Sequence, residues 1–260
     1  MTSSDSLDPT GPKSEPAVKK VHLVLQAKGG VGKTLVASLI AQYLAEKGEP
    51  PLCFDVDPGN RSLSQIKALN AIEVPMFRQD DKSLLDIDKL DDLVEQLVQA
   101  PTHCVVDNGA SGFIQFSSYL IDHDIPALLI GQGKPVVVHS VIAGGPQFMD
   151  TVRALESVLQ AFPPEVDVIV WLNEKDGQIG NGSDRSFEDT QIYSQHRDRI
   201  RSVVKLAQLN PMTFGRNLSD MLSRRMTFAE ADESSEFRMV ARQRLRQVKR
   251  PIWDQMEQAV

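Results

Sequence analysis

The chain has 260 residues, a mass of 28.8 kDa and a formal net charge of −7. This length suits one large α/β domain, and the negative charge excludes a wholly basic surface, so contact with nucleic acid or an anionic membrane would need a local patch. The two cysteines and five histidines lack the spacings of disulfide frameworks, metal hydrolases and iron–sulfur proteins, which excludes those classes, and we interpret the histidines as strand-end or surface residues. No apolar run reaches the length of a membrane span, so we expect a cytoplasmic protein.

The chain begins with residues 1–20, a segment rich in Ser, Pro, Asp and Lys that predicts a disordered tail. Residues 21–260 are predicted to form one domain, in which short apolar runs alternate with segments of helical period. The runs that predict strands are VHLVLQA, PLCFDV, HCVVD, PALLIGQ, PVVVHSVI and VDVIVWLN, and helices are expected near residues 33–47, 61–69, 112–121 and 146–162. Because these strands are apolar on both faces, the sequence predicts an α/β fold: a doubly wound, mainly parallel sheet with helices on both faces.

The last third of the chain carries a predicted loop and a predicted terminal helix. The stretch NEKDGQIGNGSDRS is rich in Gly, Asn and Asp, which predicts a loop at residues 173–186. A long helix is expected at about residues 234–258, with a proline break before PIWDQM. We assign its apolar face to Phe237, Val240, Ala241, Leu245 and Val248.

The segment QAKGGVGKT, residues 26–34, follows the first predicted strand and opens the first predicted helix. Its glycines allow backbone N–H groups to converge on phosphate oxygens, which the positive end of the helix also attracts. We expect Lys33 to reach the β- and γ-phosphates of ATP or ADP, and the Thr34 hydroxyl to bind Mg²⁺. The predicted nucleotide-binding segment comprises Lys28, Gly29, Gly30, Val31, Gly32, Lys33, Thr34 and Leu35.

Acidic residues end two further predicted strands. Asp55 and Asp57 lie at the end of LCFDVDP, and Asp107 ends HCVVD. Because the carboxyl ends of parallel strands line the ligand crevice of an open sheet, we expect the three carboxylates beside the glycine-rich segment. Asp107, after CVV, has the form of an acid that holds Mg²⁺ directly or through a water molecule.

The segment KGGVGKT resembles the deviant Walker A motif of the ParA/MinD family of P-loop ATPases. The resemblance implies that ATP holds two subunits face to face. It implies that Lys28 reaches the nucleotide of the partner subunit while Lys33 serves its own, so that both lysines act as catalytic charges.

The same resemblance implies roles for other residues. Asp57 would orient the attacking water, Asp55 would support that loop, Asp107 would be the Walker B acid, and Asn173 would contact the adenine. Two segments depart from the family pattern, since DPGN is one residue shorter than the usual DPQGN, and DNGASG lacks the prolines that often follow the Walker B acid.

A narrower resemblance, to ParA-type ATPases of plasmid transfer operons, spans nearly the whole predicted domain, including HLVLQAKGGVGKT and GRNLSDMLSRRMTFAEA. It implies slow, Mg²⁺-dependent ATP hydrolysis that switches a homodimer in plasmid conjugal transfer or maintenance, together with an unidentified stimulating or cargo protein. A biosynthetic ligase that uses ATP on a small molecule stays open, because GKPVVVHSVIAGG and the loop after Asn173 could form a second site. An electron-delivering ATPase is disfavoured, since Cys53 and Cys104 lie inside strand-like runs.

A basic stripe marks the predicted terminal helix of this otherwise acidic chain. Two interpretations stay open: contact with nonspecific DNA through phosphate neutralisation, or a solvated helix face paired with nearby acids. Membrane docking is disfavoured, because the apolar residues of the segment are assigned to packing. The stripe consists of Arg238, Arg242, Arg244, Arg246, Lys249 and Arg250.

Overall fold

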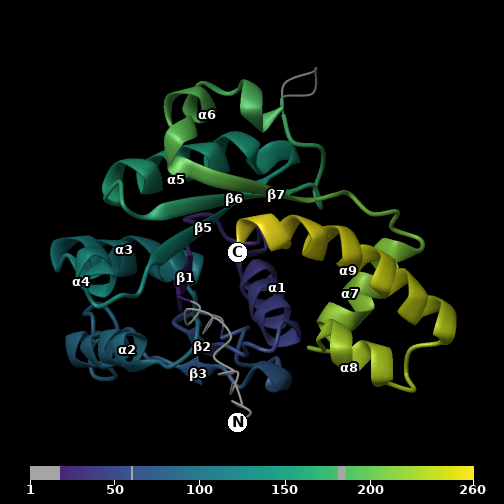
Figure 1. The fold of residues 1–260 in the computed structure, drawn as a ribbon, viewed down its shortest axis with the longest axis horizontal. Helices are drawn as coiled ribbons and strands as arrows, with labels where there is room; N and C mark the ends of the chain where they lie inside the picture. Colours follow the sequence, from purple (N-terminus) through teal and green to yellow (C-terminus); the bar gives the residue numbers. More distant parts are fainter. Residues whose placement is uncertain (1–17, 60, 181–185) are drawn as a thin grey trace, which may run out of the picture.

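The computed structural model describes residues 18–59, 61–180 and 186–260, and its centre is a twisted sheet flanked by helices (Figure 1). Nearly all of the predicted N-terminal tail therefore lies outside the described residues, as do residues 181–185 of the predicted loop. Residues 174–180, the described part of that loop, form turns and no helix or strand.

Seven strands form one sheet in the order β3-β2-β4-β1-β5-β6-β7, and every neighbouring pair of these strands is parallel. This confirms the predicted parallel α/β fold. The strands are rich in Val and Ile, and those at the centre are buried on both faces, which explains their continuous apolar runs. Their bounds are β1 Val21–Val24, β2 Leu52–Asp55, β3 Ile72–Glu73, β4 Cys104–Asp107, β5 Val136–Ala143, β6 Asp167–Asn173 and β7 Ile200–Leu206.

Strand β1 is the point where the direction of the strand order reverses. Strands β2, β3 and β4 lie on one side of β1, and β5, β6 and β7 lie on the other. In open parallel sheets the ligand crevice forms outside the carboxyl ends of the strands at such a point. The segment after β1 therefore starts at the position where a ligand site is expected.

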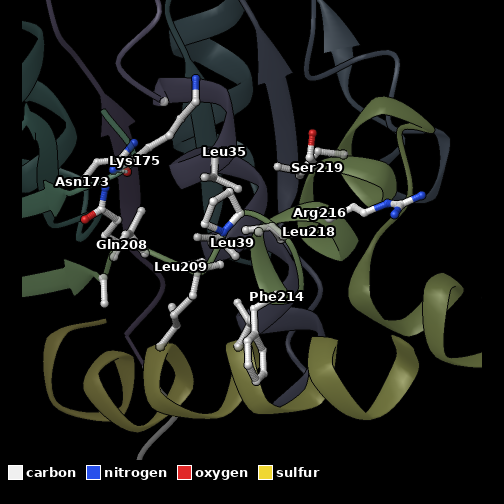
Figure 2. A pocket seen from close by; sticks show the side chains of 18 of the residues that line it. Leu35, Leu39, Asn173, Lys175, Gln208, Leu209, Phe214, Arg216, Leu218 and Ser219 are labelled. Carbon is white, nitrogen blue, oxygen red and sulfur yellow. Dashed lines mark hydrogen bonds between the residues drawn. The ribbon is translucent and has the colours of Figure 1, made fainter. Parts of the chain in front are cut away.

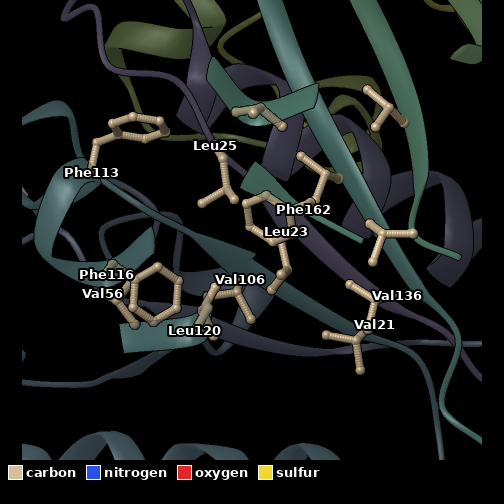
Figure 3. Close-up of a cluster of buried hydrophobic side chains, with 14 of the residues drawn as sticks. Val21, Leu23, Leu25, Val56, Val106, Phe113, Phe116, Leu120, Val136 and Phe162 are labelled. Carbon is tan, nitrogen blue, oxygen red and sulfur yellow. The ribbon is translucent and has the colours of Figure 1, made fainter. Parts of the chain in front are cut away.

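Helices cover both faces of the sheet, and each face has its own apolar cluster. One face packs against α2 (Ile87–Gln99), α3 (Phe113–Asp122), α4 (Ile125–Gly131) and α5 (Phe148–Ala161); Figure 3 shows part of this cluster around Leu23, Leu25 and Phe116. The other face packs against α1 (Lys33–Glu46), α7 (Phe214–Ser223), α8 (Phe228–Glu233) and α9 (Met239–Ala259). The short helix α6 (Gln191–Gln195) precedes β7.

Two predicted elements were wrong. The run PALLIGQ, expected as a strand, lies in helix α4, because Pro126 occupies the first turn, where its fixed φ and missing N–H favour a helix start. No α-helix forms at residues 61–69. This segment is a turn that ends in a short 3-10 helix, Lys67–Leu69. There the backbone N–H of Ser64 binds the carboxylate of Asp55 and not a helical carbonyl.

The terminal helix was also partly mispredicted. It starts at Met239 and continues through Pro251 to Ala259, so the expected proline break is wrong. The residues that it buries in the core are Leu245, Val248, Ile252, Met256 and Ala259, whereas Val240 is 56% exposed. Packing of the last two turns against the sheet and α1 outweighs the hydrogen bond that proline removes. Among the helices that the structure describes, none is long and apolar enough to cross a bilayer.

The interpretation of the histidines as strand-end or surface residues was wrong for His22 and His139, which lie inside strands, whereas His103 is at a strand end as predicted but is buried. His22, His103 and His139 are buried in or beside strands β1, β4 and β5. They tolerate burial because they form hydrogen bonds with one another. Both cysteines are also buried and free, and burial raises the pKa of Cys53 to about 12 and that of Cys104 to about 11.

Candidate nucleotide-binding site

The glycine-rich segment connects β1 to α1 across the carboxyl end of the sheet. Gly30 and Gly32 have φ angles of 76° and 103°, a left-handed conformation that favours glycine. A Cβ atom at Gly32 would also lie only 2.8 Å from Nδ2 of Asn173. Below the loop, buried Gln26 donates to the carbonyl of Val141 at 2.7 Å, which ties the start of the loop to β5.

Lys33 lies inside the loop. It begins α1, is buried, and donates from Nζ to the carbonyl oxygen of Lys28 at 2.7 Å. Burial lowers the pKa of this ammonium, although the nearby carboxylates of Asp107 and Asp57 oppose the shift. Among the described residues this ammonium donates to one carbonyl of its own loop, so it is suited to donate to phosphate oxygens instead.

Lys28 points away from the loop. Its Nζ lies 2.9 Å from Oδ2 of Asp150, at the start of α5, and the two side chains are 43% and 50% exposed. This pairing lowers the pKa of Asp150. The two lysines of the segment therefore have different surroundings, since one is enclosed by its own loop and the other lies at the surface.

The predicted carboxylates lie together at the ends of β2 and β4. The buried Asp55 accepts from the backbone N–H groups of Ser64 at 3.0 Å and Asp57 at 3.2 Å, so it fixes the turn that follows β2. Asp57 accepts from the N–H of Gly59 at 2.9 Å. Its carboxyl group also packs against Gly109, where any Cβ atom would overlap it. The segments after β2 and β4 are thus in direct contact.

Asp107 and Thr34 are the predicted magnesium ligands. Burial raises the pKa of Asp107 to about 7, although a hydrogen bond from Thr34 opposes the shift. Its Oδ1 atom is buried without a hydrogen-bond partner among the described residues, and the Thr34 hydroxyl lies 3.0 Å from that of Ser62. A buried orphan acceptor beside a hydroxyl fits a Mg²⁺ ion whose other ligands come from phosphates and water. The described residues contain no group of three or more His, Cys, Asp or Glu side chains arranged around a metal position.

Asn173, at the end of β6, reaches the loop from the opposite side. Its Nδ2 donates to the carbonyl of Val31 at 2.9 Å, and its Oδ1 accepts from the N–H of Lys175 at 3.2 Å. Both ends of its amide are therefore engaged, and Asn173 braces the loop in this structure. Its predicted contact with adenine stays a prediction.

A cleft of about 1770 Å³ runs from the loop to the helices of the C-terminal region. Gly30, Gly32, Asn173 and Gln208 line one end, and Figure 2 shows apolar side chains such as Leu35, Leu39 and Phe214 further along it. Ligand pockets usually measure about 300–1,000 Å³, so this cleft is large enough for a nucleotide and extends beyond it.

Comparison with known proteins agrees with this geometry. Residues 23–181 match the family model described as the CobQ/CobB/MinD/ParA nucleotide binding domain. Two Escherichia coli proteins, both named Protein TraL, are 39% and 40% identical to the chain over 240 residues, which cover 92% of this chain and 98% of each relative. The chain belongs to the CobQ/CobB/MinD/ParA family. The resemblance to the ParA/MinD family inferred from KGGVGKT is thereby confirmed. The narrower resemblance to ATPases of plasmid transfer operons, inferred from longer segments, is confirmed as a similarity to TraL.

Solved structures of CobQ/CobB/MinD/ParA-type domains share the fold. A ParA family ATPase from Chlorobium tepidum TLS is 17% identical, with a TM-score of 0.52, and the match covers 91% of this chain and 98% of that one. The MinD cell division protein of Aquifex aeolicus is 20% identical, with a TM-score of 0.50, and the match covers 89% and 95%.

Some residues of the candidate site were not indicated by the sequence motifs and are seen only in the structure. Asp150 lies 122 positions from Lys28, and no spacing in the sequence links them. Gln208 and the apolar residues of α7 line the cleft because the segment after β7 follows the edge of the sheet. Gly109 was visible within DNGASG, but its contact with Asp57 depends on strands β2 and β4 being neighbours.

The basic stripe of the domain is partly neutralised. Arg246 pairs with Asp232 at 2.7 Å, Lys249 with Glu46 at 2.9 Å, and Arg242 donates to the backbone carbonyl of Asp232. Arg244 lies 3.5 Å from Oδ1 of Asn217. Arg238 and Arg250 are exposed. Four of the six stripe residues thus bind acidic or carbonyl groups of the same chain, as expected for a solvated helix face.

Proposed function

We propose that this protein binds ATP with Mg²⁺, hydrolyses it slowly and thereby switches a homodimer that serves plasmid conjugal transfer or maintenance. Membership of the CobQ/CobB/MinD/ParA family supports nucleotide binding, and the similarity to TraL supports the plasmid context. A stimulating or cargo protein is part of the proposal, as is a cytoplasmic location.

In this proposal the residues of the loop and of the neighbouring strand ends have separate roles. Lys33 exchanges the carbonyl of Lys28 for the β- and γ-phosphates, and the backbone N–H groups of residues 29–33 hold the remaining phosphate oxygens. Thr34 and Asp107 hold Mg²⁺, which supplies charge neutralisation at the phosphates when it is bound. Asp57 orients the attacking water, and Asp55 fixes the turn that carries Asp57.

The observation that supports a dimer is that the side chains of the two lysines point in different directions. Lys33 is buried in its own loop, whereas Lys28 reaches the surface and binds Asp150. A lysine that acted only in its own subunit would be expected to point into the phosphate-binding loop. A lysine that serves a second subunit must be free to extend across an interface, and two nucleotides brought face to face need such cations to offset their repulsion.

Exposed apolar side chains at the edge of the sheet that carries the loop also suit contact with a second copy of the chain. Ile114, at the start of α3, is 71% exposed, and Met149, at the start of α5, is 42% exposed. Both helices begin at the carboxyl edge of the sheet, the edge that carries the loop. Exposed apolar side chains of this kind are typical of an interface that forms and dissociates.

Sedimentation with ADP, ATP and a slowly hydrolysed ATP analogue tests the proposal. The wild type should be a monomer with ADP and a dimer with the analogue. The Lys28→Ala variant should bind ATP and stay a monomer. Lys175→Ala, which removes an exposed lysine elsewhere, should dimerise normally. An unchanged nucleotide-dependent dimer in Lys28→Ala would refute the trans role.

A second candidate is a ligase that couples ATP to a small molecule, and the extent of the cleft beyond the nucleotide end favours it. In a ligase Lys28 would act in its own subunit, so Lys28→Ala would lower turnover without changing the assembly state. The same sedimentation series, combined with turnover measurements, separates the two functions.

Nonspecific DNA is a further proposed partner. Because Arg242, Arg246 and Lys249 bind groups of the same chain, contact with phosphates would depend mainly on Arg238 and Arg250. Replacing these two residues by alanine should reduce the slope of binding against salt concentration by about one phosphate contact each. An unchanged slope would show that any DNA contact lies elsewhere.

A further inference from the structure

A row of hydrogen-bonded side chains crosses the sheet below the nucleotide site. Trp171 of β6 donates from Nε1 to Nδ1 of His139 in β5 at 3.0 Å, and Nε2 of His139 lies 3.0 Å from Nδ1 of His22 in β1. Nε2 of His22 lies 3.4 Å from Nδ1 of His103, directly before β4, and Nε2 of His103 lies 3.0 Å from Oε2 of Glu49. We call these five residues the histidine chain.

The direction of every hydrogen bond in the histidine chain follows from its first member. The indole N–H of Trp171 can only donate, so Nδ1 of His139 must be an acceptor and its proton must lie on Nε2. That proton is donated to Nδ1 of His22, whose own proton is then on Nε2 and is donated to His103. All three imidazoles are therefore neutral, with the proton on Nε2.

The last histidine confirms this direction. Nδ1 of His103 also accepts from the backbone N–H of Lys20 at 3.3 Å, so it cannot carry a proton. Its Nε2–H donates to the Glu49 carboxylate, which also binds Lys19. Every ring nitrogen of the three histidines thus has a partner, and an additional proton on any Nδ1 would place two donors face to face.

The surroundings also oppose an additional charge. His22 and His139 are fully buried, and burial lowers the pKa of both, that of His139 to about 3. Burial lowers the pKa of His103 as well, while the Glu49 carboxylate raises it. Among the described residues, the charged groups beside the row are Lys19, Lys20 and Glu49. Lys20 in turn binds the carboxylate of Val260 at 2.6 Å and is flanked by the pair of Asp167 in β6 and Arg201 in β7.

The histidine chain joins the strands that carry the candidate site. His22 belongs to β1, which leads directly into the glycine-rich loop. Trp171 lies in the same strand as Asn173, which holds the carbonyl of Val31 in that loop. The row thus crosses β6, β5 and β1 to the start of β4.

We infer that the histidine chain is an acid-sensitive lock on β1, which is closed at neutral pH and opens when mildly acidic solution protonates its imidazoles. The unfolded or opened chain binds protons at an ordinary histidine pKa near 6.5, whereas the closed form binds none. The closed form is therefore fully favoured above about pH 6.5 and becomes less stable as the pH falls below it. Each histidine contributes up to about a ten-fold change in the opening equilibrium per pH unit, so three contribute up to about a thousand-fold.

Nitrogen NMR of the imidazoles in the wild-type chain tests the assignment directly. At pH 7.5 the signals of His22, His103 and His139 should be those of neutral rings with a proton on Nε2. A proton on Nδ1, or a charged ring, at any of the three would overturn the inference. This measurement needs no substitution and no nucleotide, so its result is independent of the proposed ATPase function.

Unfolding by urea tests the lock itself. The chain has two tryptophans, so Trp253→Phe leaves Trp171 as the only tryptophan whose fluorescence can report unfolding. In this background the unfolding equilibrium constant should rise as the pH falls from 7 to 5.5. His103→Gln keeps a hydrogen-bond donor and an acceptor but cannot titrate. It should therefore reduce this rise by up to about ten-fold per pH unit. His123→Gln, at an exposed position after α3, should leave the pH dependence unchanged. An equal pH dependence in His103→Gln and its parent would refute the lock.

Amide hydrogen exchange locates the opening. After correction for the intrinsic effect of pH, the amides of β1 should lose protection between pH 7 and pH 5.5 more than those of α2, which does not contribute to the histidine chain. Equal loss in both elements would mean that acid acts on the whole domain and would overturn the assignment to β1.

Discussion

The ammonium group of Lys28 lies 2.9 Å from the carboxylate of Asp150, and this ion pair holds the lysine at the surface of the free protein. The same lysine is proposed to cross to a second subunit when ATP is bound. The pair must then break, so Asp150 competes with the partner's nucleotide for the cation. Because both side chains are about half exposed, this competition is weak and readily reversed.

Asp150→Asn should therefore favour the ATP-dependent dimer. The substitution keeps the shape of the side chain but removes the charge that holds Lys28, and we expect the dimer to form at a protein concentration about two- to five-fold lower. Sedimentation with the slowly hydrolysed analogue measures this, with Glu156→Gln on the same helix as a control. Weaker dimerisation in Asp150→Asn would mean that Asp150 supports the interface instead.

Lys33→Ala should lose nucleotide binding. No other side chain of the loop is placed to bind the β- and γ-phosphates from within it, so we expect affinity for ATP to fall at least about 100-fold. Calorimetric titration measures the affinity, and Lys28→Ala is the matched control because it should bind ATP almost normally. Undiminished affinity in Lys33→Ala would refute the assignment of the phosphate site.

Gly109→Ala should destabilise the fold through the carboxyl group of Asp57. The added methyl would overlap that group, and overpacking of this kind costs about 1–3 kcal/mol of unfolding free energy. In an Asp57→Ala background the overlap disappears, so the same substitution should cost clearly less. Urea unfolding of the wild type, the two single variants and the double variant gives the coupling energy between positions 57 and 109. Strictly additive effects would show that the added methyl and the Asp57 carboxyl group do not contact each other.

Pro251→Ala should stabilise the protein. Proline inside a helix removes a hydrogen bond and lowers the unfolding free energy by about 3 kcal/mol. Alanine makes the unfolded chain more flexible, which offsets about 0.4–1 kcal/mol of the expected gain. Pro251 is exposed, so alanine removes little packing, and we expect a gain of about 2 kcal/mol in unfolding free energy. Gln243→Ala, at an exposed position of the same helix, should change stability little. A less stable Pro251→Ala would mean that the proline is required for the path of α9.

The parts of the fold that local sequence determines were predictable. The spacing of Gly29, Gly30 and Gly32 before Lys33 requires a tight loop and a helix start whatever surrounds them, and the Val-rich runs of β4, β5 and β6 indicate buried parallel strands. Helix α4 was missed because a short apolar run has the same pattern in a buried strand and in a buried helix, and only Pro126 distinguished them.

Other features depend on which strands become neighbours. The pairing of Lys28 with Asp150 and the contact of Asp57 with Gly109 join segments whose order across the sheet cannot be read from spacing. The histidine chain is the clearest case, because its three imidazoles lie in or before β1, β4 and β5, and only the register of those strands brings them into line. In isolation each of them has the appearance of an ordinary surface histidine.

The burial of both thiols has a practical consequence. With pKa values raised to about 12 and about 11, Cys53 and Cys104 hold almost no thiolate at neutral pH, so maleimide reagents should leave the native chain nearly unlabelled. A dye could then be attached at one chosen position outside the proposed interface, such as Glu95→Cys on the exposed face of α2, without first removing the native cysteines. Energy transfer between two such dyes would follow subunit association in real time.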